Sequence, residues 1–269
     1  MGEILLVTSG SGGVGRSTAA VNIGACLAYL SKSVVLVDGD MSSRELDVLL
    51  GLENRVVYDV LDLAEKKCRL SQALIKDKRF ASLYLLSASR FDGSERINRM
   101  QIILLCEELK SEFDYVIIDC PVARYMNMDI ASISDKVIVM AVGDVKSVRA
   151  ADQAVSALYS AGVKDPLLLV NKVRKDLIKN DAMIDLFSIE DLLGIRLLGA
   201  IPFDDRIIGA SNKGEPSVLD PKSRAGKAFE AVARELCGIY DHSKQVGVFS
   251  KLRLAIKNAD PIEEYMIAR

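Results

Sequence analysis

A glycine-rich segment near the N-terminus has the residue types and spacing of a phosphate-binding loop. Residues 10–18 read GSGGVGRST, which is the pattern G-x-x-x-x-G-K-[ST] with Arg16 in place of the lysine. Such glycines let backbone amides converge on phosphate oxygens, and the start of the following helix adds partial positive charge. The nucleotide-binding residues predicted from this pattern are Ser11, Gly12, Gly13, Val14, Gly15, Arg16, Ser17 and Thr18. The alternative is a tight strand-to-helix turn that binds nothing.

In a loop of this kind, the hydroxyl that follows the basic residue binds Mg²⁺. Ser17 occupies that position and is the first candidate metal ligand. Polar residues also end four apolar runs: Thr8 and Ser9, Asp38 to Asp40, Asp119, and Asn171 with Lys172. Because ligands sit outside the carboxyl ends of parallel strands, we expect these side chains to meet at one edge of a sheet.

The elements that position these residues are predicted from the apolar pattern. Continuous apolar runs span residues 4–7, 34–37, 83–86, 115–118, 137–140 and 167–170, with a weaker run at 197–201. Unbroken runs are typical of parallel strands covered on both faces. Helical periodicity is expected at 15–30, 94–110, 148–159 and 223–238. The alternation predicts an α/β fold with a doubly wound, mostly parallel sheet, in one domain over residues 1–240 followed by a tail at 241–269.

Composition narrows the classes of function. The chain has 269 residues, one histidine, five cysteines and a net charge of −2. His242 by itself excludes sites with several histidine ligands, and no cysteine pair has the C-x-x-C spacing of a zinc site. The near-neutral charge gives no general attraction to nucleic acid, so we expect no nucleic-acid partner. An odd number of cysteines makes a framework of disulfides unlikely, which suits a reducing compartment. We therefore expect a cytoplasmic protein.

The tail has the layout of a helix that lies on a membrane surface. Residues 244–257 carry four cations and no anions, and the apolar side chains fall within an arc of roughly 120° on a helix. Cations flank that arc, which suits anionic headgroups. The membrane-binding residues predicted here are Val248, Phe249, Lys251, Leu252, Arg253, Ile256 and Lys257. The alternative is an amphipathic helix packed on the domain, and Leu254 lies off the apolar face.

Together, these motifs resemble the MinD branch of the MinD/ParA ATPases, a P-loop family with a deviant Walker A loop that reads K-G-G-x-G-K-[ST]. The resemblance extends through DGD at 38–40, RELD at 44–47, the stretch 113–121, NK at 171–172 and the segments 198–202 and 210–216. It implies that ATP and Mg²⁺ are the cofactors and that Asn171 contacts the adenine. It also implies that Asp40 orients the attacking water and that Asp38 and Asp119 support the metal. Turn or helix capping is the alternative for both metal carboxylates, and a turn for Asn171.

Two departures from the family loop bear on catalysis. The family's first lysine reaches into the partner's phosphates across a dimer, and its second contacts the β- and γ-phosphates; here they are Ser11 and Arg16. A planar guanidinium does not reproduce a compact ammonium. Since this catalysis depends on positioning and on stabilising phosphate charge, we expect Asp40 and Arg16, the catalytic candidates, to support weak hydrolysis or none. Residues at 122, 123 and 150 depart from the family pattern too.

The resemblance implies an ATP-controlled switch that acts in division-site placement. It would form a homodimer, or a heterodimer with a related ATPase, bind a division-inhibitor or activator protein, and attach peripherally to the inner face of the cell membrane. The first alternative is a pseudo-ATPase of the same fold that serves as an interaction scaffold. The second is a ParA-like partition ATPase, which would need a basic surface for DNA.

Overall fold

The computed structural model describes residues 2–41, 43–89, 98–120 and 128–239. The chain divides into two compact units, Met1–Ala233 and Arg234–Arg269. The first holds the whole sheet, and only residues 234–239 of the second are described. The predicted domain limits of 1–240 and 241–269 therefore stay predictions.

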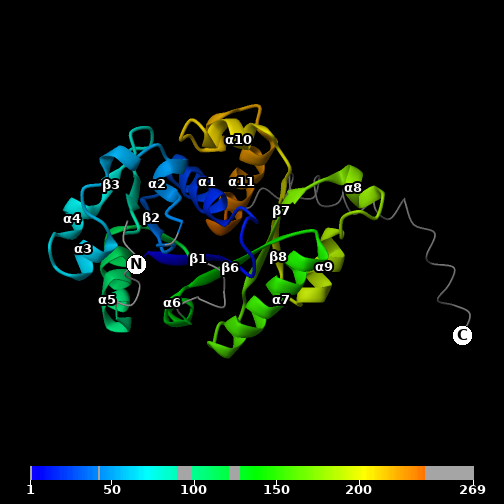
Figure 1. Ribbon diagram of the computed structural model, residues 1–269, viewed down its shortest axis with the longest axis horizontal. Coiled ribbons are helices and arrows are strands. Elements are labelled where there is room, and N and C mark those ends of the chain that lie inside the picture. The colour runs from blue at the N-terminus through cyan, green and yellow to red at the C-terminus, as the bar shows by residue number, and fades with distance from the viewer. Residues whose placement is uncertain (1, 42, 90–97, 121–127, 240–269) are drawn as a thin grey trace, which may run out of the picture. The chain divides into compact units, whose positions relative to one another are not determined.

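An eight-stranded sheet with the order β3-β4-β2-β5-β1-β6-β7-β8 forms the centre of the first unit (Figure 1). All neighbouring strands pair in parallel except β3 with β4. The strands are β1 (Glu3–Ser9), β2 (Val34–Asp38), β3 (Ile75–Lys76), β4 (Leu83–Leu86), β5 (Tyr115–Asp119), β6 (Lys136–Val142), β7 (Leu167–Val173) and β8 (Leu197–Pro202). All seven predicted runs are strands, and the doubly wound, mostly parallel sheet is confirmed.

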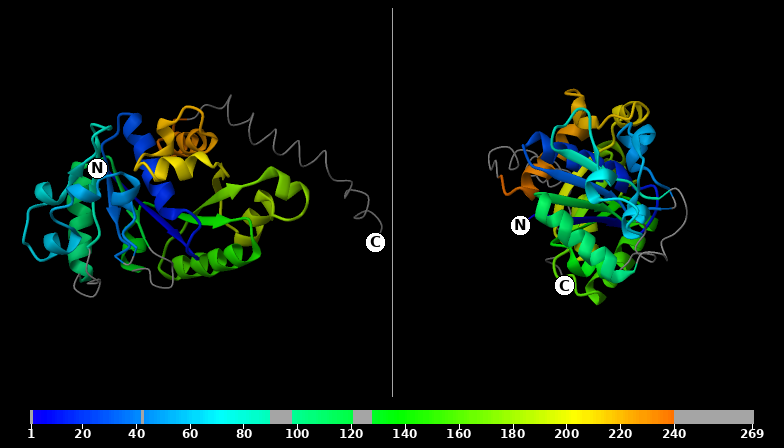
Figure 2. Two further views of the ribbon diagram at one scale, coloured as in Figure 1. Left: turned by 45° about the horizontal axis from the view of Figure 1, so that its top comes forward. Right: turned by 90° about the vertical axis from the view of Figure 1, so that its left-hand side faces the viewer.

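Helices cover both faces of this sheet, as Figure 1 and the two further views in Figure 2 show. The predicted long helices are α1 (Arg16–Tyr29), α5 (Arg99–Glu112), α7 (Val145–Ser160) and α11 (Arg224–Leu236). Residues 94–97 of the second predicted helix lie outside the described residues. The shorter helices were not predicted: α2 (Leu46–Leu49), α3 (Val60–Ala64), α4 (Leu70–Ala73), α6 (Met128–Ile133), α8 (Lys175–Lys179), α9 (Leu186–Leu193), α10 (Arg206–Ser211) and the 3-10 turns Glu53–Arg55 and Ser217–Leu219.

Strand β1 and helix α1 are both deeply buried. Leu5, Leu6 and Val7 of β1 are fully buried between neighbouring strands and the helices above and below. Helix α1 is buried on nearly all sides, because small residues let it approach the sheet closely. A Cβ at Gly24 would lie 2.7 Å from a methyl carbon of Leu36 on β2. This tight packing fixes where the first turn of α1 points.

The strand register brings the candidate residues to one edge of the sheet. Asp38, the last residue of β2, pairs in register with Asp119, the last residue of β5. Val7 of β1 pairs with Asp119 from the other side, and β1 continues into the glycine-rich loop. Two carboxylates and the loop therefore converge where parallel strands place their ligands.

Candidate functional site

The glycine-rich loop connects β1 to α1 and borders a cavity of about 540 Å³. Gly15 caps the helix in the left-handed region, with φ 92°. A Cβ added at Gly12 or Gly13 would meet no atom within 4 Å, so the tip of the loop faces open space. The predicted residues Ser11 to Thr18 all line this cavity. The loop leads into a helix of 14 residues, and the exposed backbone N–H groups at the start of such a helix can bind an anion.

Arg16 points into the cluster of carboxylates at the strand ends. Its Nη2 lies 2.8 Å from Oδ2 of Asp40, and its Nε donates to Oδ1 of Asp119. Only 9% of the Arg16 surface is exposed, and Asp119 is almost completely buried. Burial by itself would lower the pKa of Arg16, but Asp119 and Asp40 raise it above its ordinary value. The guanidinium is therefore held as a buried cation between two acids.

Asp38, at the end of β2, is a third buried acid beside this cluster. Its carboxylate accepts hydrogen bonds from the backbone amides of Asp40, at 3.0 Å, and Leu46, at 3.1 Å. Burial and the neighbouring charge of Asp119 raise the pKa of Asp38 to about 7. Burial raises the pKa of Asp119 too, against the opposing effect of Arg16. The Asp38 carboxylate thus caps the turn that follows β2. Its support of a metal stays a prediction.

Oδ2 of Asp119 is buried without a hydrogen-bond partner, whereas Oδ1 pairs with Arg16. Ser17, the other candidate metal ligand, lies in the first turn of α1 and is 5% exposed. Among the described residues, no three histidine, cysteine, aspartate or glutamate side chains are grouped so that they could hold a metal ion. A hydrogen bond from Ser17 is among the effects that lower the pKa of Asp119, so these two candidate ligands are adjacent, while Arg16 pairs with Oδ1 of the same carboxylate.

Asn171 and Lys172 attach the end of β7 to the loop. Nδ2 of Asn171 donates to the Val14 carbonyl at 2.7 Å, and its Oδ1 accepts from the Lys172 amide at 2.8 Å. Nζ of Lys172 donates to the Gly13 carbonyl at 2.7 Å. Asn171 is buried within β7, so its interpretation as a turn residue is wrong. Its contact with adenine stays a prediction.

Several features of this cavity were not predicted from the sequence. Lys172 was expected at this edge of the sheet, but nothing in the pattern indicates that its ammonium reaches the loop. Pro202, Phe203 and Ile208 form an apolar part of the wall after β8. Asp204, beside them, accepts from the Ser223 hydroxyl and from the amides of residues 206, 224 and 225. That aspartate stabilises the start of α11, a role that the capping preference of Asp makes understandable.

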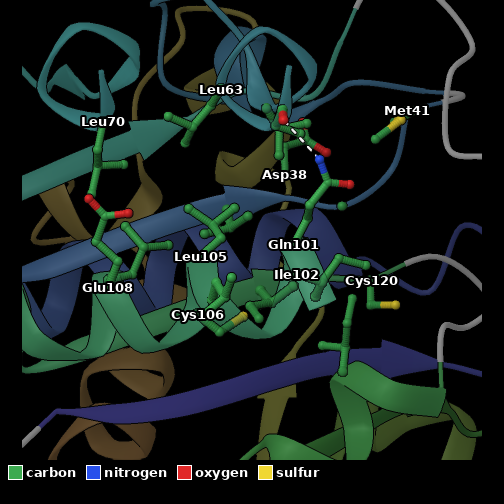
Figure 3. A pocket seen from close by; sticks show the side chains of 18 of the residues that line it. Asp38, Met41, Leu63, Leu70, Gln101, Ile102, Leu105, Cys106, Glu108 and Cys120 are labelled. Carbon is green, nitrogen blue, oxygen red and sulfur yellow. Dashed lines mark hydrogen bonds between the residues drawn. The ribbon is translucent and has the colours of Figure 1, made fainter. Parts of the chain in front are cut away.

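A second, larger cavity of about 990 Å³ lies on the other side of the β2 end. Figure 3 shows its wall, where Ile102, Leu105 and Cys106 of α5 face Leu63 and Leu70. Nε2 of Gln101 donates to the Ala64 carbonyl at 2.8 Å across this region. Burial raises the pKa of the Cys106 thiol to about 11, so the thiol stays protonated. The apolar wall does not suit phosphate.

Some predicted residues lie outside the described residues. These are the seven membrane-binding candidates of the tail and residues 121–127 after β5. Cys120 is described and buried, which agrees with its interpretation as a small apolar residue. In the part of the chain that the structure describes, no helix has the length and hydrophobicity to cross a bilayer.

Comparison with known proteins decides the family. Residues 5–218 match the family described as the CobQ/CobB/MinD/ParA nucleotide binding domain. The septum site-determining protein MinD of Bacillus subtilis is 44% identical over 243 residues, covering 88% of this chain and 90% of that protein. The chain belongs to the MinD family. It is thus a MinD-like member of a nucleotide-binding family whose relatives are named for septum-site determination.

Solved structures of MinD agree with this assignment. In the MinC:MinD cell division protein complex of Aquifex aeolicus, a chain 38% identical to this one superposes with a TM-score of 0.82. The alignment covers 88% of this chain and 96% of that one. The MinD cell division protein of the same organism gives a TM-score of 0.80 at 36% identity, covering 88% and 97%. The fold of this chain is therefore that of MinD.

Proposed function

We propose that this MinD-family chain is an ATP-binding switch that acts in placing the division septum and hydrolyses ATP weakly or not at all. One observation carries the second half of the proposal. Arg16, which stands where the family has a catalytic lysine, pairs with Asp40, the residue that would orient the attacking water. Both catalytic candidates are therefore engaged with each other.

ATP binding is supported by the shape of the loop. The cavity of about 540 Å³ collects the loop glycines, the first turn of α1 and an apolar wall at Phe203 and Ile208. Amides and a helix start suit phosphates, and an apolar slot suits a base. The same features support residues 11–18 and Asn171 as the nucleotide-binding set.

Magnesium fits part of the described site. A resident Mg²⁺ would be held by Ser17 and Asp119 and backed by Asp38. Oδ1 of Asp119 pairs with the Arg16 guanidinium, but Oδ2 of Asp119 is buried without a hydrogen-bond partner and is the oxygen left for the ion. The Asp38 carboxylate, which bonds backbone amides, would support the turn beside it. The ion would supply positive charge next to the phosphates, and no step of the proposed function passes through it.

Hydrolysis is disfavoured by charge as well as by geometry. A transferred phosphoryl group needs cations directed at its oxygens, and removing one such cation from related enzymes costs on the order of 10³- to 10⁵-fold in rate. Ser11 is uncharged, and the donors of Arg16 on Nε and Nη2 already bond carboxylates. The ATPase activity that the family implies is therefore expected to be slow.

Attachment and partners follow from the family and from the tail. We propose a dimer, either of two copies or with a related ATPase, that binds the inner face of the cell membrane through residues 248–257. Two weak helices in one dimer would bind far more firmly than one. The Aquifex MinC:MinD cell division protein complex supports a division-inhibitor or activator protein as a partner. The protein would be cytoplasmic and peripheral at the membrane.

A pseudo-ATPase scaffold of the same fold is the second candidate. The ion pairs of Arg16 favour it, because they leave the loop neutralised without any ligand. The ParA-like partition function has no comparable support: the described surface offers no observation that favours DNA.

The experiment that tests the proposal measures ATP binding and ATP turnover by the full-length protein, beside a Ser11→Lys, Arg16→Lys double variant. We expect the natural chain to bind ATP and turn it over slowly, with faster turnover by the variant. Binding restored only in the variant would favour the scaffold. Rapid turnover by the natural chain would contradict the proposed weakness.

A further inference from the structure

We propose that the carboxylates of Asp40 and Asp119 act as internal substitutes for phosphate, and that by holding Arg16 they lower the affinity of the loop for nucleotide. This inference rests on the proposed nucleotide-binding function and concerns the regulation of the same site. In this proposal the two acids oppose nucleotide binding. Neutralising either of them would therefore strengthen it.

The donors of Arg16 carry the first step. A guanidinium bonds an oxyanion best through two adjacent nitrogens that donate in parallel. In Arg16, Nε donates to Asp119 and the neighbouring Nη2 donates to Asp40 at 2.8 Å. Each of these donors would be available to a phosphate oxygen only after it leaves a carboxylate. The acids and a phosphate therefore compete for one face of the guanidinium, the face formed by Nε and Nη2.

The charges around the cavity carry the second step. The cations on its described wall are Arg16 and Lys172, and the Lys172 ammonium bonds the Gly13 carbonyl at 2.7 Å. Three acids, Asp40, Glu45 and Asp204, line the same cavity. With both cations engaged, a polyphosphate that enters meets a wall that is acidic on balance.

Burial carries the third step. Arg16 is 9% exposed and Asp119 is 1% exposed, so water cannot easily replace one ion pair when Arg16 turns to a phosphate. A buried carboxylate that loses its cation is strongly unfavourable. The free energy of nucleotide binding is therefore reduced by the cost of leaving a buried carboxylate without its cation. Replacing that acid by an uncharged amide removes most of this cost.

The test compares ATP binding by the full-length protein and by two variants, Asp40→Asn and Asp119→Asn, in calorimetric titrations with EDTA present. Asp77→Asn is the matched control, because Asp77 is also buried and forms an ion pair, with Arg79 at 2.6 Å, away from the cavity. Inorganic triphosphate is titrated in parallel, since it lacks a base and reports on the phosphate contacts alone.

We expect each variant to bind ATP and triphosphate about tenfold more tightly than the natural chain, the effect of about one hydrogen bond to a charged group. The control should bind like the natural chain. Equal or weaker binding by the folded variants would overturn the inference. If either asparagine variant fails to fold, the serine variant at the same position, Asp40→Ser or Asp119→Ser, replaces it.

The two proposals fail in different ways. Tight binding by the natural chain and no gain in the variants would retain the nucleotide switch and overturn the inference. No binding by the natural chain but clear binding by the variants would support the inference and contradict the nucleotide switch. No binding by any of them would overturn both.

Discussion

Nη2 of Arg16 lies 2.8 Å from Oδ2 of Asp40, and this ion pair joins the first turn of α1 to the loop that follows β2. The two residues are 24 positions apart in the chain. Asp119 bonds the same guanidinium from the end of β5. A residue that departs from the family loop thus forms the central contact of the site.

Asn171 is expected to stabilise the loop through its amide. Asn171→Ala removes the bonds to the Val14 carbonyl and the Lys172 amide, and we expect the free energy of unfolding to fall by about 1–2 kcal/mol. Asn171→Asp should cost more, because a carboxylate oxygen would then face the Val14 carbonyl. Urea denaturation of both variants measures the difference. An aspartate variant as stable as the natural chain would mean that the amide is oriented the other way.

Substitutions at two glycines of the loop are expected to have different effects, one on stability and the other on ATP binding. Gly15 has φ 92°, and a Cβ there would clash with the Asn171 amide, so Gly15→Ala should lower the free energy of unfolding by roughly 1–3 kcal/mol. Gly12→Ala places its methyl group in open space at the mouth of the cavity. That variant should unfold like the natural chain but bind ATP more weakly. Equal thermal midpoints for the two variants would contradict this assignment.

Acid should remove the stability that Asp204 provides. Burial by itself would raise the pKa of Asp204, but the Ala225 amide, the Ser223 hydroxyl and further amides lower it below its ordinary value. A depressed pKa in the folded state stabilises the fold above the unfolded value of about 3.9, and that stability is lost as the pH falls through the folded pKa.

The measurement follows unfolding of the natural chain and of Asp204→Asn from pH 7 to pH 3. Asp204→Asn should be less stable at pH 7, and the difference should shrink on acidification. Ser223→Ala is the control, because it removes one hydrogen bond to Asp204 without removing the titrating group. A difference for Asp204→Asn that stays constant down to pH 3 would show that Asp204 contributes no acid-sensitive stability.

The tail is expected to bind anionic membranes through one face of a helix. Phe249→Glu with Leu252→Glu puts charge on the predicted apolar arc and should weaken sedimentation with phosphatidylglycerol vesicles by at least about tenfold. Leu254→Glu, off that arc, should change binding little. Equal losses for both variants would indicate that the residues do not act as one helical face.

The sequence predicted the fold well because its strongest signals are local. Unbroken apolar runs such as 115–118 indicate buried parallel strands, and the glycine-rich loop indicates the turn from β1 to α1. Short helices such as α8 were missed because their few residues carry no clear periodicity. Strand β3 has two residues and pairs antiparallel, so its formation depends on β4 more than on its own composition.

The sequence predicted which residues form the site better than it predicted the contacts between them. The loop, Asp38, Asp40 and Asp119 were expected at one sheet edge, and the strand register places them there. The partners of Arg16 were not predicted, because a pattern of residue types does not tell which acid a long side chain reaches. The contact of Lys172 with Gly13 was not predicted either, since it depends on a left-handed backbone with φ 55°.

The most direct test of the account is a double-mutant cycle between Arg16 and Asp40, measured as free energies of unfolding without nucleotide. The cycle uses Arg16→Met, Asp40→Asn and the double variant, and it isolates the energy of the pair from that of each residue. We predict a favourable coupling of about 1 kcal/mol or more, as expected for a hydrogen-bonded buried pair. Additive effects, with no coupling, would mean that Arg16 is free to meet a phosphate and would contradict the account.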